Sequence, residues 1–459
     1  MALKIDSPSI LQYTEFLNGS TAVPIVHIFA RDENGELYVR SGQVVSGPHI
    51  QGTWTKLGLT PSGAQVASQP VGTTTYIDTA GVRQAHAFVV GQDNQLSTLS
   101  LNVDTDSWDW RKLPPPPAGH RFISPPTVVP FLFEQSTWRI NALICAHRES
   151  DAQGVLLAYV FDGTQETWID FPKPEAGPND LDFVFQFGAA LFEGVNLTEI
   201  YTVIAGTAAH QSFLLSWDGS ASVSSKKVWT TLTQGQPPNN LFSNYMALTK
   251  VSIPLLDTQR LVASVIAGSA PPHLFACVSD DGTNWVWQDR GSDASGRSLG
   301  GKLGSFGYIR VISSPTGRFF VPLFVTSVLY GDGSVGMNFW DGQKSNWANL
   351  GLPPGGATGI PCGAGFYVGP DDQAVETVVI LTQTVDGKLY VNQPGPFGRQ
   401  WLPLEALPML KTPKYNPQLK EFPTDGALRS IQTKLNQTDA KVEQLQKEIH
   451  VLRSRMKAS

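Results

Sequence analysis

Four polar side chains with acid, base or hydrogen-bonding chemistry fall on segments that are rich in aromatic residues: His120, Arg121, Tyr245 and Tyr308. A tyrosine hydroxyl and a guanidinium donate hydrogen bonds, and an imidazole can act as a general acid. In an apolar setting such donors polarise a substrate oxygen and stabilise the charge that develops on it. We therefore take these four residues as candidate catalytic groups.

The same segments supply apolar rings and one further polar group. The candidate substrate-binding residues are Phe122, Gln186, Phe242, Phe306 and Phe366. An apolar pocket with a few convergent polar groups is the usual composition of a small-molecule site. The alternative is that most of these rings face neighbouring elements as core, because successive residues of a strand point to opposite faces.

One short motif suggests a nucleophilic serine. Residues 296–300 read GRSLG and match the pattern G-x-S-x-G. That elbow requires a strand-to-helix turn in an α/β sheet, whereas here the motif lies in a Gly/Ser-rich segment between expected strands. The eight histidines show no metal-ligand spacing, and the cysteines and histidines form no zinc-like cluster. The sequence therefore predicts neither a metal site nor a cofactor.

Seven tryptophans at near-regular spacing indicate the elements that position these groups. They are Trp54, Trp110, Trp168, Trp229, Trp287, Trp347 and Trp401. Six of the seven are followed three positions later by Leu or Phe, and the exception is Trp287, where Arg290 takes that place. A sequence period of about 40–50 residues is typical of propeller repeats.

Each period repeats the same order of strands and turns. In the first, VHIFA turns at Asn34-Gly35 into ELYVR, and in the last, VVILTQ turns at Asp386-Gly387 into KLYVN. Asx-Gly pairs between apolar runs are a strong hairpin signal, because a tight turn needs positive φ. We expect an all-β fold in which residues 1–405 form a seven-bladed β-propeller, with each repeated Trp wedged between blades.

The C-terminal segment follows a different pattern. After an expected linker at 406–423 the sequence keeps a heptad repeat. Position a holds Leu428, Leu435, Val442, Ile449 and Met456, and position d holds Ile431, Thr438, Leu445 and Leu452. This pattern predicts an α-helical coiled coil over 424–459. We expect the chain to associate with itself through this segment, as a dimer or a trimer.

Composition limits the classes of partner. The formal net charge is −6, which argues against the basic surface that nucleic-acid binding needs. No segment is apolar over the length of a membrane span, and we expect no membrane partner. Cys145, Cys277 and Cys362 are scattered over separate modules, as expected for reduced core thiols. The expected localisation is cytoplasmic.

The strand, Asx-Gly turn, strand and W-x-x-L order resembles fungal and bacterial lectin-like propellers, including the fucose-lectin and tectonin types, over residues 9 to about 405. In fucose-type lectins each cleft between blades repeats an Arg, a Glu and an aromatic residue. Here the comparable places hold His27, His86, Asn141 and Tyr201, so no such trio recurs. A lectin of this type is therefore expected to have one site per ring.

A lectin-like ring with a single aromatic funnel is also similar to the cofactor-free hetero-Diels–Alderases of fungal tropolone–sesquiterpenoid biosynthesis. This resemblance implies an enzyme of secondary metabolism that binds apolar reactants in a central pocket and joins a quinone-methide-like heterodiene to a terpene alkene. Orientation of two reactants alone lowers a barrier by up to about 7–11 kcal/mol. The alternatives are a carbohydrate-binding lectin and a protein-interaction scaffold oligomerised by the coiled coil.

Overall fold

The computed structural model describes residues 6–404 apart from segments 18–20, 44–51, 77–82, 103–104, 134–136, 151–152, 162–165, 172–187, 194–197, 207–210, 219–226, 233–236, 238–241, 254–257, 269–270, 294–295, 315–316, 369–374 and 396–397. Met1–Thr14 and Pro24–Leu410 form one compact unit, and Glu15–Val23 and Lys411–Ser459 form a second. The ring described below belongs to the first unit, apart from the adjoining ends of its first two strands at 15–17 and 21–23. The predicted coiled coil at 424–459 lies outside the described residues.

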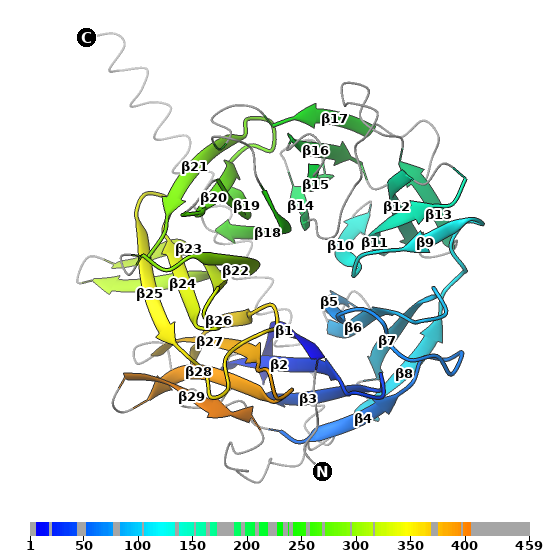
Figure 1. Cartoon of the computed structure of the whole chain (residues 1–459), viewed down its shortest axis with the longest axis horizontal. Helices are drawn as coiled ribbons and strands as arrows, with labels where there is room; N and C mark the ends of the chain where they lie inside the picture. The colour runs from blue at the N-terminus through cyan, green and yellow to red at the C-terminus, as the bar shows by residue number, and fades with distance from the viewer. Residues whose placement is uncertain are drawn as a thin grey trace, which may run out of the picture. The chain divides into compact units, whose positions relative to one another are not determined.

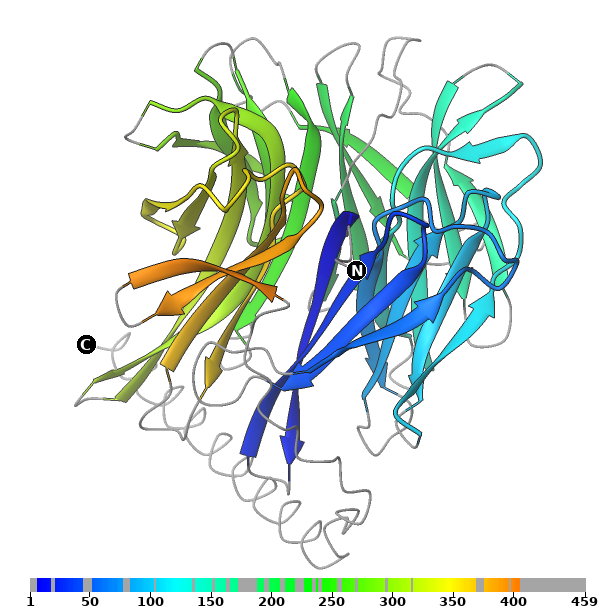
Figure 2. The same ribbon diagram turned by 60° about the horizontal axis from the view of Figure 1, so that its bottom comes forward.

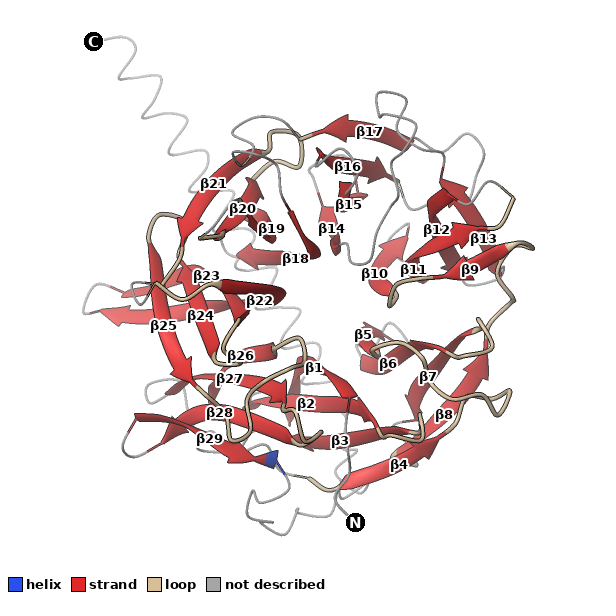
Figure 3. Ribbon diagram, viewed as in Figure 1, coloured by secondary structure: helices blue, strands red, loops and turns tan. Residues whose placement is uncertain are grey.

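The described chain is an all-β propeller, as expected, and its strands form seven antiparallel sheets (Figures 1 and 3). We number the sheets in chain order. Sheets 1 to 3 contain β1 (Asp6–Leu17), β2 (Thr21–Arg31), β3 (Leu37–Gln43) and β4 (Trp54–Gly58); β5 (Val71–Tyr76), β6 (Arg83–Val90), β7 (Leu96–Asn102) and β8 (Ser107–Lys112); and β9 (His120–Phe122), β10 (Thr127–Phe133), β11 (Thr137–Arg148), β12 (Gln153–Phe161) and β13 (Glu166–Phe171).

The other four sheets follow the same order. Sheets 4 and 5 contain β14 (Gly188–Glu193), β15 (Thr198–Gly206), β16 (Gln211–Trp217) and β17 (Lys227–Thr231); and β18 (Phe242–Ile253), β19 (Thr258–Ala267), β20 (His273–Ser279) and β21 (Val286–Gly291). Sheets 6 and 7 contain β22 (Leu299–Ser314), β23 (Gly317–Tyr330), β24 (Val335–Trp340) and β25 (Ser345–Gly351); and β26 (Cys362–Val368), β27 (Val375–Gln383), β28 (Leu389–Gly395) and β29 (Gly398–Pro403).

Each sheet is built from strands that are consecutive in the chain, so each sequence module corresponds to one sheet. The first long strand of every sheet lies nearest the centre and the last lies at the rim (Figure 1). In the tilted view of Figure 2 the strands run between the two faces of the ring. Helix is nearly absent from the described part of the chain (Figure 3).

The repeated tryptophans tie each sheet to the one before it. The indole Nε1 of Trp110 donates to the carbonyl oxygen of Leu57 at 2.8 Å, and that of Trp401 donates to Leu350 at 2.8 Å. The same bond joins Trp287 to Leu232, Trp347 to Arg290, and Trp168 to Pro114. The acceptor is the residue three positions after the preceding Trp, or the next one. The W-x-x-L repeat therefore places a donor and an acceptor at these five junctions.

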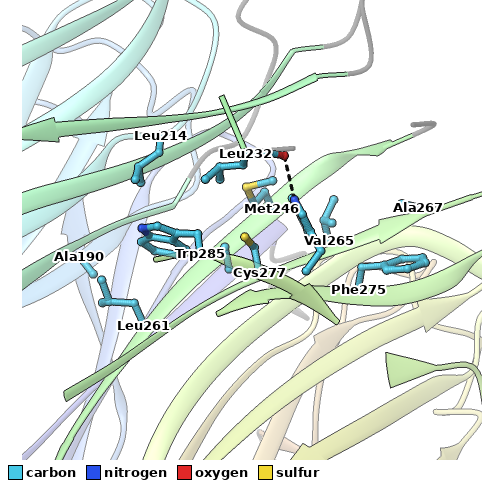
Figure 4. Packing of buried hydrophobic residues seen from close by; sticks show 12 residues of the cluster. Ala190, Leu214, Leu232, Met246, Leu261, Val265, Ala267, Phe275, Cys277 and Trp285 are labelled. Carbon is cyan, nitrogen blue, oxygen red and sulfur yellow. Dashed lines mark hydrogen bonds between the residues drawn. The ribbon is translucent and has the colours of Figure 1, made fainter. Parts of the chain in front are cut away.

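Side chains at the same junctions form the apolar core. Between sheets 4 and 5, Leu232 packs with Leu261, Met246, Cys277 and Trp285, all buried (Figure 4). Burying apolar area stabilises the fold by about 25 cal/mol for each Å² removed from water. The core thus lies between sheets rather than at the centre of the ring.

Glycines let the innermost strands approach closely. A Cβ at Gly72 of β5 would lie 2.6 Å from the Cβ of Leu11 on β1, and a Cβ at Gly188 of β14 would lie 2.2 Å from the backbone nitrogen of Leu248 on β18. Such distances are too short for real carbon contacts, so only glycine fits. The inner edges of neighbouring sheets are in direct contact.

The segments that link one sheet to the next are fixed by backbone hydrogen bonds. Val66, on the way from β4 to β5, donates its N–H to the carbonyl of Gly35 in the β2–β3 turn at 2.8 Å. Ala357, between β25 and β26, donates to Gly333 at 2.8 Å in the same manner. Each link therefore lies against the turn of the sheet that it leaves.

The ring closes between sheets 1 and 7 without exchange of a strand. Gln12 of β1 donates to the carbonyl oxygen of Gly365 at 2.7 Å, and Arg40 of β3 donates to that of Leu404 at 2.6 Å. Leu404 is the acceptor that the repeat would offer to Trp54, whose buried Nε1 has no hydrogen-bond partner among the described residues. Arg40 takes over the bond that tryptophan makes at the other junctions.

This exchange gives a matched pair of substitutions. Trp401→Phe removes the indole bond to Leu350 and leaves its carbonyl unpaired, which costs about 1–2 kcal/mol. Trp54→Phe removes no hydrogen bond, so we expect a smaller loss or none. Urea unfolding of the full-length variants, followed by tryptophan fluorescence, measures both effects. Equal losses in the two variants would contradict the assigned role of the indole N–H.

Candidate functional site

Two of the predicted site residues, Phe306 and Tyr308, are brought together on β22, where their rings stack with centroids 6.5 Å apart. They lie against the inner strand of sheet 7. A Cβ at Gly363 would lie 2.5 Å from Cε1 of Phe306, and one at Gly365 would lie 2.5 Å from Cδ1 of Tyr308. Tyr308 is buried in the core between sheets 6 and 7. These two aromatic residues therefore pack between sheets.

His120, Arg121 and Phe122 form β9, which pairs with β11 of sheet 3. The His120 ring lies 3.6 Å from a carboxylate oxygen of Asp170 on β13, the last strand of the same sheet. The ring of Phe122 packs on that of Trp168, with centroids 5.5 Å apart. These predicted donors and wall residues contact sheet 3 itself, and the structure does not bring them to Phe306 and Tyr308.

Four other predicted residues give no geometry. Phe242 and Tyr245 belong to β18 and Phe366 belongs to β26, but their side chains lie outside the described residues. Gln186 lies outside them altogether. Their predicted roles stay predictions.

The G-x-S-x-G segment is a link between sheets 5 and 6 and not a nucleophile elbow. Its Ser298 is exposed and lies directly before β22, a strand rather than the helix that an elbow requires. The Ser298 carbonyl accepts the N–H of Gly331 at 3.0 Å. This matches the sequence-based argument against a catalytic serine.

The most unusual group of charged and aromatic residues lies between sheets 5 and 6, and the exception in the tryptophan repeat leads to it. Arg290, at the position of the usual Leu or Phe, lies over the indole of Trp340 with Cζ 3.4 Å from the ring centroid. Both side chains are buried, at 8% and 3% exposure. Neither Nη2 of Arg290 nor Nε1 of Trp340 has a hydrogen-bond partner in the described structure.

A second arginine completes this group. Arg260 of β19 lies over the same indole, with Cζ 5.3 Å from its centroid, and pairs through two nitrogens with the carboxylate of Asp280. A Cβ at Gly342 would lie 2.2 Å from Nη1 of Arg260, so this guanidinium reaches the turn after β24. We call Arg260, Asp280, Arg290, Trp340 and Asp341 the Arg–Trp cluster.

The electrostatics of the Arg–Trp cluster centre on Arg290. Burial, and to a lesser extent repulsion from Arg260, lower the pKa of Arg290 to about 9, with Asp341 opposing the shift. A buried charge without a bonded counterion is costly. By contrast, Arg260 and Asp280 expose 27% and 61% of their side chains, so their pair is solvated. The cluster therefore has a solvated outer pair and an inner guanidinium with an unused donor.

The junction between sheets 3 and 4 shows the corresponding contact between two apolar side chains. There Phe171, three residues after Trp168, packs edge-on against Trp217 with centroids 5.1 Å apart. Arg290 and Trp340 occupy the same two module positions. A charged side chain thus replaces an apolar one at only one of the described junctions. The sequence already showed this break in the repeat at Arg290. Its partner Arg260 had no such signal.

Two histidines in the second strands are buried and hydrogen-bonded. His27 Nδ1 lies 2.8 Å from the Ser41 hydroxyl, and its Nε2 lies 3.1 Å from the Tyr13 hydroxyl. His86 makes the same contact with Ser100 at 2.8 Å. Burial lowers the pKa of each imidazole to about 4. These histidines act as neutral links between neighbouring strands.

Other reactive groups are inert or dispersed. Burial raises the pKa of the Cys145 and Cys362 thiols to about 12, so they are protonated and poor nucleophiles at neutral pH. Over the described ranges, His, Cys, Asp and Glu side chains form no group of three or more that could hold a metal ion. None of the helices in that part of the chain is both long and apolar enough to cross a membrane.

No protein-family model matches the sequence, and no curated protein matches it either. Solved structures with a similar fold include the Aleuria aurantia lectin bound to α-methyl-L-fucoside (14% identity, 78% of this chain and 100% of that chain, TM-score 0.44). They also include AofleA from Arthrobotrys oligospora (9% identity, 77% and 89%, TM-score 0.45).

A glycosidase is also among the similar structures: the α-L-arabinofuranosidase Arb93A from Fusarium graminearum with an iminosugar inhibitor (13% identity, 76% and 96%, TM-score 0.45). A structure of the Aleuria lectin is described as six-bladed, whereas the described strands of this chain form seven sheets. With TM-scores this low, the likeness carries nothing about what this chain binds.

The buried histidines predict a loss of stability in acid. Unfolded histidine has a pKa near 6.5, and the folded values are about 4, so the unfolded chain binds more protons between these limits. The neutral histidines contribute their full share to the free energy of unfolding above about pH 6.5. This contribution falls towards pH 4, by up to about 3 kcal/mol for each histidine. Unfolding midpoints from pH 8 to pH 4.5 measure this fall. In the double variant His27→Gln/His86→Gln the unfolding midpoint should fall less between pH 8 and pH 4.5 than in wild type. An equal fall in both proteins would refute the role assigned to the two histidines.

Proposed function

We propose that this protein is a carbohydrate-binding propeller of the lectin type, with one sugar site at the Arg–Trp cluster between sheets 5 and 6. The observation that carries the proposal is the approach of two guanidinium groups to one indole, with Asp280 paired to Arg260 and the charge of Asp341 acting on Arg290. Charged donors and acceptors make strong hydrogen bonds to hydroxyl groups, and an indole packs against apolar C–H surfaces. A sugar offers both kinds of surface.

Access to the indole depends on Arg260. Its guanidinium lies over the ring and is held by Asp280, but both side chains are solvated. The bidentate pair with Asp280 and the contact with the indole each contribute about 1 kcal/mol at a partly exposed position, so new contacts to a ligand can offset the displacement of Arg260. The displaced guanidinium and the freed Asp280 carboxylate would then bind the hydroxyl groups of the sugar that takes its place over Trp340.

A single site fits the way in which the modules differ. The described junctions repeat the structural tryptophan bond, whereas the pairing of arginine with indole at the position of Arg290 belongs to one of them. A lectin with a site at every junction would repeat its ligand-binding residues. This chain repeats only the groups that hold the ring together.

The alternative, a cofactor-free enzyme that performs a hetero-Diels–Alder addition, has less support. It requires aromatic side chains that line a central pocket and donors that point into it. Phe306 and Tyr308 pack on Gly363 and Gly365, and Phe122 packs on Trp168. The described candidates are thus engaged in contacts within and between sheets.

The carbohydrate proposal is tested with a glycan array probed by the labelled full-length protein. We expect wild type to bind a restricted set of glycans and Arg260→Ala to weaken that binding by about tenfold or more, because one charged hydrogen bond contributes about 1.5–3 kcal/mol. Arg111→Ala is the matched control and should bind as wild type does, because Arg111 is an exposed arginine that also pairs with a carboxylate, Glu166, and lies over an aromatic ring, Phe161, away from the cluster. An array without hits would refute the proposal.

We also propose that residues 424–459 join copies of the chain through the heptad positions. A helix with an apolar stripe of this length needs a partner to cover the stripe. Leu445→Asp, at a d position, should shift the mass in solution to that of one chain. Ala440→Asp, at the outward f position, places the same charge away from the seam and should leave the mass unchanged. Light scattering after size exclusion gives both values, and a monomeric wild type would contradict the proposal.

A further inference from the structure

We propose that the ligand of the Arg–Trp cluster is an acidic saccharide, whose anionic group binds the Nη2 nitrogen of Arg290. This inference rests on the proposed function and names the class of sugar. It starts from an unusual feature of Arg290: the side chain is 8% exposed, and its Nη2 is fully buried without a hydrogen-bond acceptor in the described structure.

A buried guanidinium normally has its donors satisfied, because a buried charge without a partner strongly destabilises the fold. The other groups of the cluster do not satisfy this one. Asp280 is engaged by Arg260 through both carboxylate oxygens. Asp341 accepts the backbone N–H groups of Gln343 and Lys344 at 2.9 and 2.7 Å. No described residue accepts a hydrogen bond from this Nη2, so an acceptor atom of a ligand can satisfy it.

The two aspartates balance the two arginines over the cluster as a whole, but the positive charge at the buried Nη2 of Arg290 has no acceptor of its own in the described part of the chain, and this local charge favours an anion. Arg260 adds a second positive charge near Arg290, and the two repel each other. A carboxylate or sulfate group between them would relieve this repulsion, and planar guanidinium groups match the geometry of such anions. Arg260 is the more exposed of the two, so its displacement opens the path from solvent to Arg290.

The position of Arg290 in the repeat argues against a purely structural role. Every other module has Leu or Phe three residues after its Trp, and Phe171 shows that an aromatic ring packs well on the tryptophan of the next sheet. Replacing a buried charge by an apolar side chain is often neutral or stabilising. The arginine is therefore retained at a cost to the fold that the apolar residues of the other modules avoid.

The test uses an array that pairs each uronic acid, sialic acid or sulfated glycan with its neutral counterpart. The full-length protein is applied at pH 7.5, where Arg290 is charged, with and without inorganic sulfate as a competitor. We expect at least about tenfold stronger binding to the acidic member of a pair. Arg290→Leu, which restores the pattern of the other modules, should remove this preference while the protein remains folded. Arg111→Leu, at an exposed arginine that lies over the Phe161 ring on sheets 2 and 3, is the control.

Each outcome separates this inference from the proposed function. Binding to neutral glycans alone, or an unchanged preference in Arg290→Leu, overturns the inference and leaves the carbohydrate proposal standing. Inorganic sulfate that binds to Arg290 when no glycan does overturns both, because the site would then be a simple anion site. Arg290→Lys keeps the charge and loses the planar fork, and it should retain only part of the preference if the geometry of the guanidinium matters.

Discussion

Each sheet of this protein has two apolar faces, and only the neighbouring sheets of the ring can cover them. The indole bond that five of the repeated tryptophans make to the preceding module fixes this contact, and Trp401 and Trp110, for example, reach Leu350 and Leu57 at 2.8 Å. The bond satisfies a carbonyl that the end of an outer strand would otherwise leave unpaired. The apolar packing between sheets and the course of the segments that connect them depend on this repeated junction.

The general fold was predictable because this junction leaves a regular trace in the sequence. A tryptophan every 54 to 61 residues, with Asx-Gly turns between apolar runs, indicated antiparallel sheets in a propeller. The closure through Arg40 was not predictable. Arg40 and Leu404 are far apart in the chain, and no local pattern shows that a guanidinium replaces the indole at one junction.

The candidate site was harder to predict, for a physical reason. Aromatic residues on inner strands suggested a funnel, but glycines on the adjacent strand let rings such as Tyr308 lie flat between sheets. Periodicity alone does not distinguish a ring that lines a channel from one that packs on a neighbouring glycine. The useful signal was instead the interruption of the repeat at Arg290, where a charge stands in an apolar position.

The closure between sheets 1 and 7 has a mechanical consequence. At each of the remaining junctions the polypeptide chain itself connects the two sheets. The junction between sheets 1 and 7 is held instead by packing around Val26 and Leu404 and by hydrogen bonds such as that from Gln12 to Gly365. A pulling force applied to the first and last strands would load this junction in shear before it reached the rest of the molecule. The contact between sheets 1 and 7 would then separate first, and the ring would open into a linear series of sheets joined by the chain.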